Sequence, residues 1–280
     1  MIKSNFIAKN WENIKINKKE PRFCKGIFKI NSKDFTELFS NKTLTRKIII
    51  KLYNGYFVLI KNVYKDQEIE NLINKLLKIE NCSKGNFFKL NRKIPNFYRR
   101  ITKKISRKYA VPTDRTSWYF FRWNKDSKYY FKLFDPLWSK VKLLNGLKKN
   151  QYKKNTPFDK NNVDRIQAVR YPHKSGFIKA HSHQTVSTFL SISIYLSQKN
   201  IDYKSGGTYF FLNKNKKFFV ENEVCKGDVG IFYGSLYHGV DKFLVIKNKK
   251  INPKRLGRWW VGLYSPESDL KKNRLTSVVK

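Results

Sequence analysis

Cysteine is scarce in this chain of 280 residues, and the three that occur, Cys24, Cys82 and Cys225, lie far apart. An odd number at such spacing fits neither a disulfide framework nor a zinc-binding motif, so we expect a reducing, cytoplasmic setting.

Long apolar runs are also missing. The N-terminus has no hydrophobic core of a signal peptide, and no run approaches the length of a membrane span. The sequence therefore predicts no membrane span.

Acidic residues are few as well. The chain has 20 Asp and Glu against 60 Lys and Arg, which gives a formal net charge of +40. A polyanionic partner, such as nucleic acid or anionic lipid, would explain this excess. The composition of an AT-rich genome would explain it too, and both interpretations stay open. Basic residues are spread along the chain, with one denser cluster at 98–108, where helical spacing would place them beside a stripe of Tyr and Ile.

The N-terminal half predicts helices around one buried strand. Residues 1–45 show no clear period and are expected to be irregular. Residues 55–64 are β-branched and aromatic, which is typical of a buried strand. Residues 65–80 carry apolar side chains at helical spacing, with Asp66 as a candidate N-cap. Three further elements are expected: a helix over 98–109, a strand over 117–124, and a helix over 127–149 broken near Asp135 and Pro136.

The C-terminal half has a different character. Between residues 164 and 265, short apolar segments alternate with turns rich in Gly, Asn and Lys. Many short strands at this spacing are typical of an antiparallel sandwich or barrel. We therefore expect one α+β domain over 46–266, with helices packed on a β core at about 164–265, and a polar tail over 267–280.

Histidine occurs four times, and two of the four stand one residue apart in the segment GFIKAHSHQ. In a β-strand, His181 and His183 would point to the same face. His238 follows a Gly227–Asp228 turn and an apolar strand, whereas His173 lies in a predicted loop. His181, His183 and His238 are therefore candidate metal ligands.

The order of these motifs resembles the iron(II)/2-oxoglutarate-dependent oxygenases. The chain reads Gly176-x4-His181-x-His183, then Gly206-Gly207, Gly227-Asp228, His238 and Arg258. The family pattern is Gly-x4-His-x-Asp/Glu, a Gly-Gly strand start, a Gly-Asp turn, a distal His and a final Arg. The resemblance implies a double-stranded β-helix of the jelly-roll or cupin kind. It implies iron(II) and 2-oxoglutarate as cofactors, and O2-dependent hydroxylation of a small molecule or side chain with decarboxylation of 2-oxoglutarate to succinate.

One position departs from the family, because His183 stands where the carboxylate is usual. The family's pattern leaves three interpretations. His181, His183 and His238 all bind iron; or only His181 and His238 bind it, as in the related halogenases; or the motif is degenerate and binds no catalytic metal. The resemblance makes Arg258 the clamp for the far carboxylate of 2-oxoglutarate, since a planar guanidinium suits a carboxylate. Gln167, Arg170 and Tyr195 are further candidates to line the pocket.

Rival functions remain at this point. A three-histidine iron dioxygenase would need no 2-oxoglutarate, and a metal-free jelly roll would need no iron. A nucleic-acid partner is disfavoured, because the demethylases of this superfamily carry Arg-x-Asn-x-Thr-x-Arg where this chain reads RLGRWWV.

Overall fold

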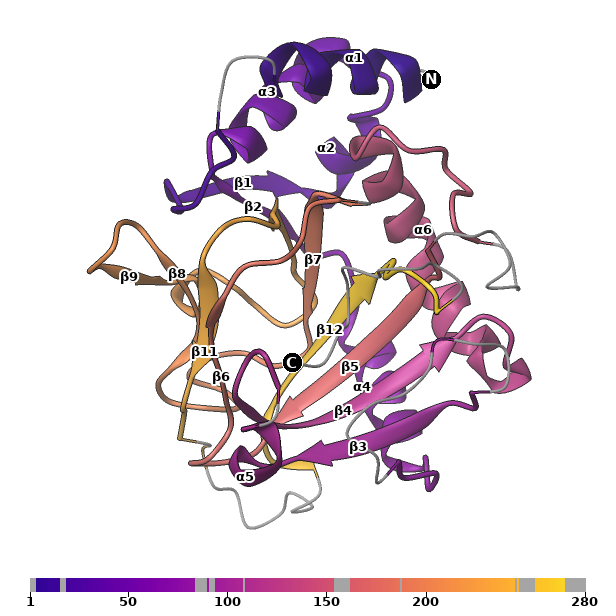
Figure 1. Cartoon of the computed structure of the whole chain (residues 1–280), viewed down its shortest axis with the longest axis vertical. Coiled ribbons are helices and arrows are strands. Elements are labelled where there is room, and N and C mark those ends of the chain that lie inside the picture. The colour runs from indigo at the N-terminus through magenta and orange to yellow at the C-terminus, as the bar shows by residue number, and fades with distance from the viewer. Residues whose placement is uncertain are drawn as a thin grey trace.

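Two facing β-sheets form the centre of the protein, with helices on the outside of the larger one (Figure 1). The computed structural model describes residues 4–15, 19–83, 90, 94–107, 109–153, 162–186, 188–244, 246 and 255–269. The helices are α1 Ser4–Lys15, α2 Ser32–Glu37, α3 Lys42–Tyr53, α4 Asp66–Leu77, α5 Lys103–Ser106 and α6 Lys128–Leu144, with 3-10 turns at Lys125–Ser127 and Val220–Asn222. The strands are β1 Ile27–Asn31, β2 Phe57–Lys61, β3 Phe97–Ile101, β4 Thr113–Phe121, β5 Arg165–Tyr171, β6 Phe177–His181, β7 Leu190–Tyr195, β8 Gly207–Phe211, β9 Lys217–Phe219, β10 Val229–Tyr233, β11 His238–Asp241 and β12 Arg258–Tyr264.

The last eight strands are divided between the two sheets, four in each. In the larger sheet the order is β10-β7-β12-β5, extended by β2 and β1 at one edge and by β4 and β3 at the other. In the smaller sheet the order is β6-β11-β8-β9. The chain passes from β5 to β6, back to β7, across to β8 and β9, and so on to β12. This path over eight strands is a jelly roll, so the expected α+β fold with a double-stranded β-helix core is confirmed.

One strand joins the two sheets. The first residues of β4 pair with β6 of the smaller sheet, through Thr113 and Asp114. From Thr116 onward, β4 pairs with β5 of the larger sheet. Arg115 therefore lies at the corner where the strand passes from one sheet to the other.

The outer face of the larger sheet is apolar and carries the helices. Alternate residues of each strand reach this face, as the pleat requires. Trp118 of β4 stacks on Trp259 of β12 with ring centroids 5.2 Å apart, and Phe120 stacks on Tyr130 of α6 at 3.7 Å. These residues belong to one large hydrophobic cluster that also includes the buried faces of α3 and α4. The other face of the sheet, toward β6 and β11, carries polar side chains such as Gln167 and Ser191 beside apolar ones such as Val169.

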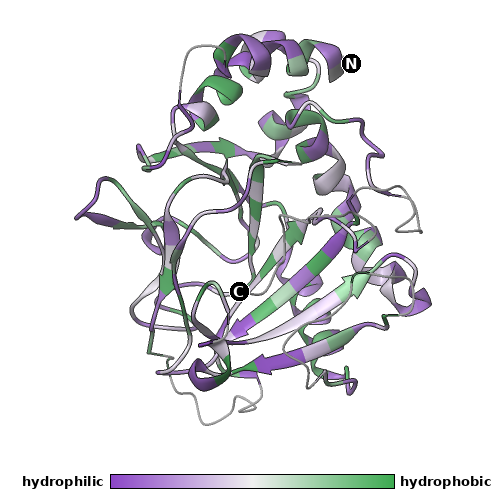
Figure 2. Cartoon of the chain, in the orientation of Figure 1, coloured by the Kyte–Doolittle hydropathy of each residue, from purple (hydrophilic) through white to green (hydrophobic). Residues whose placement is uncertain are grey.

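The segment 1–45 was expected to be irregular, and that expectation is wrong for most of it. It contains α1, α2 and β1, and β1 pairs in parallel with β2. Ile7 and Trp11 of α1 are buried, and the Trp11 indole donates to the carbonyl of Leu144 at 2.7 Å. Tertiary burial of a few side chains, not a long period in the sequence, stabilises these helices. In Figure 2 the helices at the top of the molecule carry both hydrophilic and hydrophobic residues, as expected of helices with one buried side.

The prediction of a helix over 98–109 is also wrong. Residues 97–101 form β3, which pairs with β4 along its whole length, and only the single turn of α5 is helical. Phe97, Arg99 and Ile101 are buried at alternate positions, so the period is two. Pairing with a neighbouring strand outweighed the helical spacing of the basic residues. The cluster at 98–108 therefore does not form a basic helix face.

Two smaller expectations concerned helix ends and breaks. The structure contains the strand expected over 55–64 as β2 and the helix expected over 65–80 as α4. The N-cap of α4 is Lys65 rather than Asp66. Glu68 accepts a hydrogen bond from the Lys65 amide at 2.9 Å. The expected break near Pro136 is wrong, because α6 runs unbroken past it. Phe134, Leu137 and Trp138 bury that stretch of the helix.

Two expectations concerned a membrane span and the C-terminal tail. No helix in the described ranges is long and apolar enough to span a membrane. The polar tail expected over 267–280 lies mostly outside the described residues, which end at Asp269.

Candidate metal centre

Three histidines meet between the two sheets. His181 at the end of β6 and His238 at the start of β11 are directly paired in the smaller sheet. His183 lies two residues beyond β6, and its amide donates to the carbonyl of Gly234 at 2.8 Å. The ring centroids are 4.6 to 5.2 Å apart, and one nitrogen of each ring lies within 4.8 Å of the other two. The expected cluster of His181, His183 and His238 is therefore present.

The second nitrogen of each ring is already held by the protein. The Nδ1 atoms of His181 and His238 lie 2.9 and 2.8 Å from the carbonyl oxygens of Lys179 and Leu236. A carbonyl only accepts, so in both rings Nδ1 carries the proton and Nε2 keeps a free lone pair. Such an outer hydrogen bond commonly fixes the tautomer of a histidine that binds a metal.

His183 is held by a hydroxyl instead. Its Nδ1 lies 2.7 Å from Ser191 Oγ, and its Nε2 lies 3.2 Å from His181 Nε2. Without a metal, Ser191 donates to Nδ1, and the His183 Nε2–H donates to His181. With a metal at Nε2, the same hydroxyl turns and accepts from Nδ1–H, because a serine serves in both roles. Two nitrogens bound at right angles about 2.1 Å from a metal lie roughly 3 Å apart, close to the observed distance.

All three rings are neutral at physiological pH. Burial, with a smaller contribution from the charge of Arg115, lowers the pKa of His181 to about 4 and that of His183 to about 3. Burial also lowers the pKa of His238 well below its usual value. A histidine binds a metal in its neutral form, so protons do not compete with a metal here.

The histidines line a small enclosed cavity of about 50 Å³. Ile178, Phe232 and Val240 supply apolar walls, and Arg115, Arg258 and Tyr264 supply polar ones. Three imidazoles suit iron, zinc, copper or nickel better than magnesium or calcium. All three line the same cavity, so a metal that they held would have further positions open toward the rest of it.

Gly176 has a steric role in placing this site. A Cβ atom here would come within 2.7 Å of both the Pro172 oxygen and the Tyr171 Cβ. The chain can therefore turn tightly from β5 into β6 only with glycine at this position. The motif spacing from Gly176 to His181 reflects this turn.

Arg258, the expected clamp, lies in the cavity wall but is already paired. Its side chain is 2% exposed, and its Nη2 lies 2.5 Å from Glu221 Oε1 and 2.6 Å from Thr208 Oγ1. The guanidinium Nη1 is buried without a hydrogen-bond partner. Sequence reasoning missed Glu221, which comes from the 3-10 turn after β9.

The other candidate pocket residues fall in different places. Tyr195 lies beside Arg258, with its ring centroid 5.6 Å from the guanidinium carbon, and its hydroxyl has no hydrogen-bond partner. Gln167 lies on the inner face of β5 and donates to Ser117 at 3.4 Å, outside the wall of the histidine cavity. Arg170 points to the outer face, where it lies 5.7 Å from the ring of Trp259. The structure thus places Tyr195 beside Arg258 but outside the lining of the cavity, and keeps Arg170 on the opposite face of the sheet.

Ser191 and Arg115 are two functional candidates that the sequence did not reveal. Ser191 is one of several serines in a strand, and only the fold shows which one faces His183. Arg115 is one of many basic residues, and its corner position between the sheets distinguishes it from the others.

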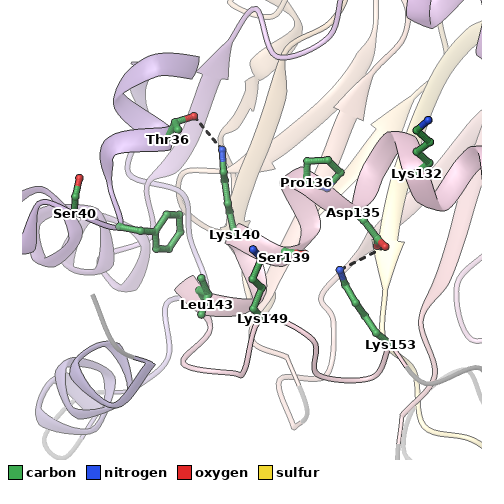
Figure 3. A pocket seen from close by; sticks show the side chains of 11 residues that line it. Thr36, Ser40, Lys132, Asp135, Pro136, Ser139, Lys140, Leu143, Lys149 and Lys153 are labelled. Carbon is green, nitrogen blue, oxygen red and sulfur yellow. Dashed lines mark hydrogen bonds and ion pairs between the residues drawn. The ribbon is translucent and has the colours of Figure 1, made fainter. Parts of the chain in front are cut away.

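A larger cavity of about 680 Å³ lies away from the histidines, between α6 and the end of α2 (Figure 3). Lys132, Lys140, Lys149 and Lys153 surround it over a floor of apolar side chains. Its one acid, Asp135, is engaged by Arg122 at 2.7 Å and by Lys153 at 3.5 Å. None of the described residues lining it is a histidine or cysteine, so the chemistry of metal binding belongs to the smaller cavity.

Comparisons with known proteins found likeness in structure only. No protein-family model matches the chain, and no curated protein sequence matches it. A prolyl-4-hydroxylase from Pseudomonas putida is similar in structure, with 10% identity, a TM-score of 0.46, and 79% of this chain and 97% of that chain covered. A full-length Neurospora crassa protein in complex with alpha-KG and thymine has 14% identity, a TM-score of 0.49, and 86% and 85% of the two chains covered. A Trichoplax adhaerens prolyl hydroxylase in complex with a hypoxia inducible factor peptide has 13% identity, a TM-score of 0.47, and 83% and 93% covered.

Likeness at this level concerns the path of the chain and carries nothing about substrate. The pairing of this chain's own strands and the convergence of its own histidines are independent of it. They give the chain a double-stranded β-helix fold with a three-histidine cluster between its two sheets.

Proposed function

We propose that this protein is an iron(II)- and 2-oxoglutarate-dependent oxygenase that hydroxylates a small molecule or a side chain. One observation carries the proposal: three neutral histidines bring one ring nitrogen each within 4.8 Å of the others, while their Nδ1 atoms are held by Lys179, Leu236 and Ser191. Bound iron(II) with 2-oxoglutarate would supply O2 activation and the oxidation of a C–H bond. The protein's own part is to hold the metal, orient the cosubstrate and exclude water.

The wall beside the histidines offers donors for an oxyanion. Arg258 Nη1 and the hydroxyl of Tyr195, whose ring lies beside the guanidinium, are buried and have no hydrogen-bond partner. Buried polar groups are nearly always paired, so two unpaired donors side by side point to a missing acceptor. A carboxylate of the cosubstrate provides such an acceptor, and this supports Arg258 as its clamp.

Two features oppose easy binding of the cosubstrate. Glu221 already neutralises Arg258, and a second carboxylate would compete with it for the guanidinium. The cavity of about 50 Å³ also holds only a few water molecules, because each needs at least about 10–15 Å³. Side chains of the wall must therefore move before 2-oxoglutarate enters.

The pairing of Arg258 with Glu221 favours a second candidate function. A three-histidine iron dioxygenase that needs no 2-oxoglutarate would leave this ion pair undisturbed as part of the wall. Its substrate would bind directly in the small cavity beside the metal. The two candidates share the metal and differ in the cosubstrate, so one titration separates them.

The test is the visible spectrum of the anaerobic protein with iron(II), recorded before and after addition of 2-oxoglutarate. The proposal expects one iron per chain and a new charge-transfer band that saturates with 2-oxoglutarate. The variant His181→Ala should lose the iron, and His173→Ala, a histidine outside the cluster, should keep it. Iron without a band would favour the second candidate, and absence of bound iron would refute both.

A further inference from the structure

Arg115 is a half-buried cation that faces the metal centre from the strand between the sheets. It lines the same cavity as the three histidines. Its Nε is buried without a hydrogen-bond partner. Its position at the corner of β4, between the residues that pair with β6 and those that pair with β5, fixes the direction of its side chain.

The groups around Arg115 are hydroxyls and cations. The ionisable groups that act on it most strongly are Tyr171, Tyr119 and Tyr264. Burial raises the pKa of Tyr264 to about 12, so its hydroxyl stays protonated. Burial alone would raise the pKa of Tyr119, but Arg99, Arg115 and Arg165 outweigh it and leave that pKa below its usual value. This part of the wall is thus positive.

The other charged groups of the cavity cancel one another. Arg258 is matched by Glu221, and the three histidines are neutral. None of the described residues that line the cavity is acidic. Iron(II) would add two positive charges, and dianionic 2-oxoglutarate would cancel them. The charge of Arg115 then remains without a counterpart beside the metal.

The histidine at the position of the family's usual carboxylate leaves the charge of Arg115 still less compensated. A carboxylate ligand would place a negative charge about as close to Arg115 as the imidazole of His183, whose pKa Arg115 lowers. With His183 in that position, the site has no such charge of its own. A guanidinium that lines an enclosed cavity and lacks an anion there binds an oxyanion through charge-assisted hydrogen bonds.

We propose that Arg115 binds an oxyanionic group of the substrate, a carboxylate or a phosphate, and so holds the substrate beside the metal. The inference rests on the proposed function and narrows it to anionic substrates. Tyr171 Oη and the Trp260 Nε1, both buried and without hydrogen-bond partners, supply further donors in the same wall. A guanidinium fork binds the two oxygens of such a group and fixes its orientation as well as its distance.

The experiment uses acetate and inorganic phosphate as probes, at constant ionic strength, because the net charge of +40 attracts any anion weakly. Each probe is titrated into the metal-free protein and into the iron(II)–2-oxoglutarate complex under anaerobic conditions. Tryptophan emission, to which Trp260 in the cavity wall contributes, and the thermal unfolding midpoint are followed. We expect saturable binding that Arg115→Gln weakens about tenfold or more, and that Arg46→Gln, an exposed arginine of α3, leaves unchanged.

Three outcomes would overturn the inference. Absence of saturable binding in the wild type would do so, as would equal binding by Arg115→Gln and Arg46→Gln. Loss of the 2-oxoglutarate band in Arg115→Gln would assign Arg115 to the cosubstrate instead. Failure of the proposed function looks different: no charge-transfer band forms in the wild type, while acetate still binds the metal-free protein in an Arg115-dependent way.

Discussion

The hydroxyl of Ser191 decides which nitrogen of His183 is free. Its replacement in Ser191→Ala removes the group that accepts from Nδ1–H in the metal-bound state. Loss of such an outer partner commonly lowers metal affinity about 10- to 100-fold. We expect a decrease in iron(II) affinity of that size, measured by competition with a chelator of known affinity.

Ser193 provides the matched control for this change. It lies two residues along the same strand, lines the same cavity, and makes no hydrogen bond to a histidine. Ser193→Ala should keep the iron(II) affinity of the wild type. Equal losses in both variants would mean that polarity of the cavity, and not the Ser191–His183 bond, stabilises the metal.

Glu221 competes with any anion for Arg258. In Glu221→Gln the amide oxygen can still accept from the Thr208 backbone, but the negative charge is gone. Arg258 is then a buried, unpaired cation, and breaking such a pair typically costs about 3–5 kcal/mol. We expect a clear fall in the unfolding midpoint without cosubstrate, and a larger rise than the wild type shows when 2-oxoglutarate is added.

The affinity for 2-oxoglutarate gives the second readout for Glu221. The Kd measured by calorimetry with iron(II) should fall about tenfold or more, since a charge-assisted hydrogen bond is worth about 1.5–3 kcal/mol. Glu223→Gln is the control, because Glu223 pairs with Lys29 on the surface. Weaker binding by Glu221→Gln would show that Glu221 orients Arg258 for the cosubstrate instead of competing with it.

At the scale of elements, the turn between β5 and β6 sets the position of His181 and His183. In Gly176→Ala the new methyl group would overlap the Pro172 oxygen and the Tyr171 Cβ, so the backbone must shift. Overpacking of this kind typically costs about 1–3 kcal/mol. We expect a loss of that size in the free energy of unfolding, together with weaker iron binding. Ser175→Ala, one residue earlier, should change neither, and an unshifted iron affinity in Gly176→Ala would show that the site tolerates movement of β6.

The strands of the C-terminal half were predictable because each carries its own local signal. Apolar runs between Gly and Asn turns gave every strand from β5 to β12. The helix wrongly expected over 98–109 shows the limit of such signals, since Arg99 and Ile101 fit either period and only pairing with β4 decides. Helix α1 was missed for the opposite reason: its two largest buried residues, Ile7 and Trp11, are too few to form a pattern.

Site residues of a rare type could be predicted from the sequence, whereas site residues of an abundant type could not. Histidines are few, so His181, His183 and His238 stood out, and they do converge. Basic residues are many, so nothing in the sequence distinguished Arg115 from the surface lysines. Glu221 lies far from Arg258 in the chain, and their pairing is a product of the fold.

At the scale of the whole molecule, the net charge of +40 should make stability depend on salt. Like charges repel most where they are close, and around the large cavity of Figure 3 burial and the nearby Lys149 both lower the pKa of Lys140. An increase of NaCl from about 0.01 to 0.15 M shortens the Debye length from about 30 to about 8 Å. Screening weakens both repulsion and the surface ion pairs, but 20 acids cannot balance 60 basic residues.

The unfolding midpoint should therefore rise with NaCl, by roughly 2–4 °C for each kcal/mol of repulsion relieved. Lys149→Glu tests the local origin of this effect, because it replaces one repulsive partner of Lys140 with an attractive one. The variant should be more stable than the wild type at low salt, and the difference should shrink as salt is added. A midpoint that falls with NaCl in the wild type would mean that the surface ion pairs, such as Lys217–Asp241 at 2.8 Å, stabilise the fold more than the excess charge destabilises it.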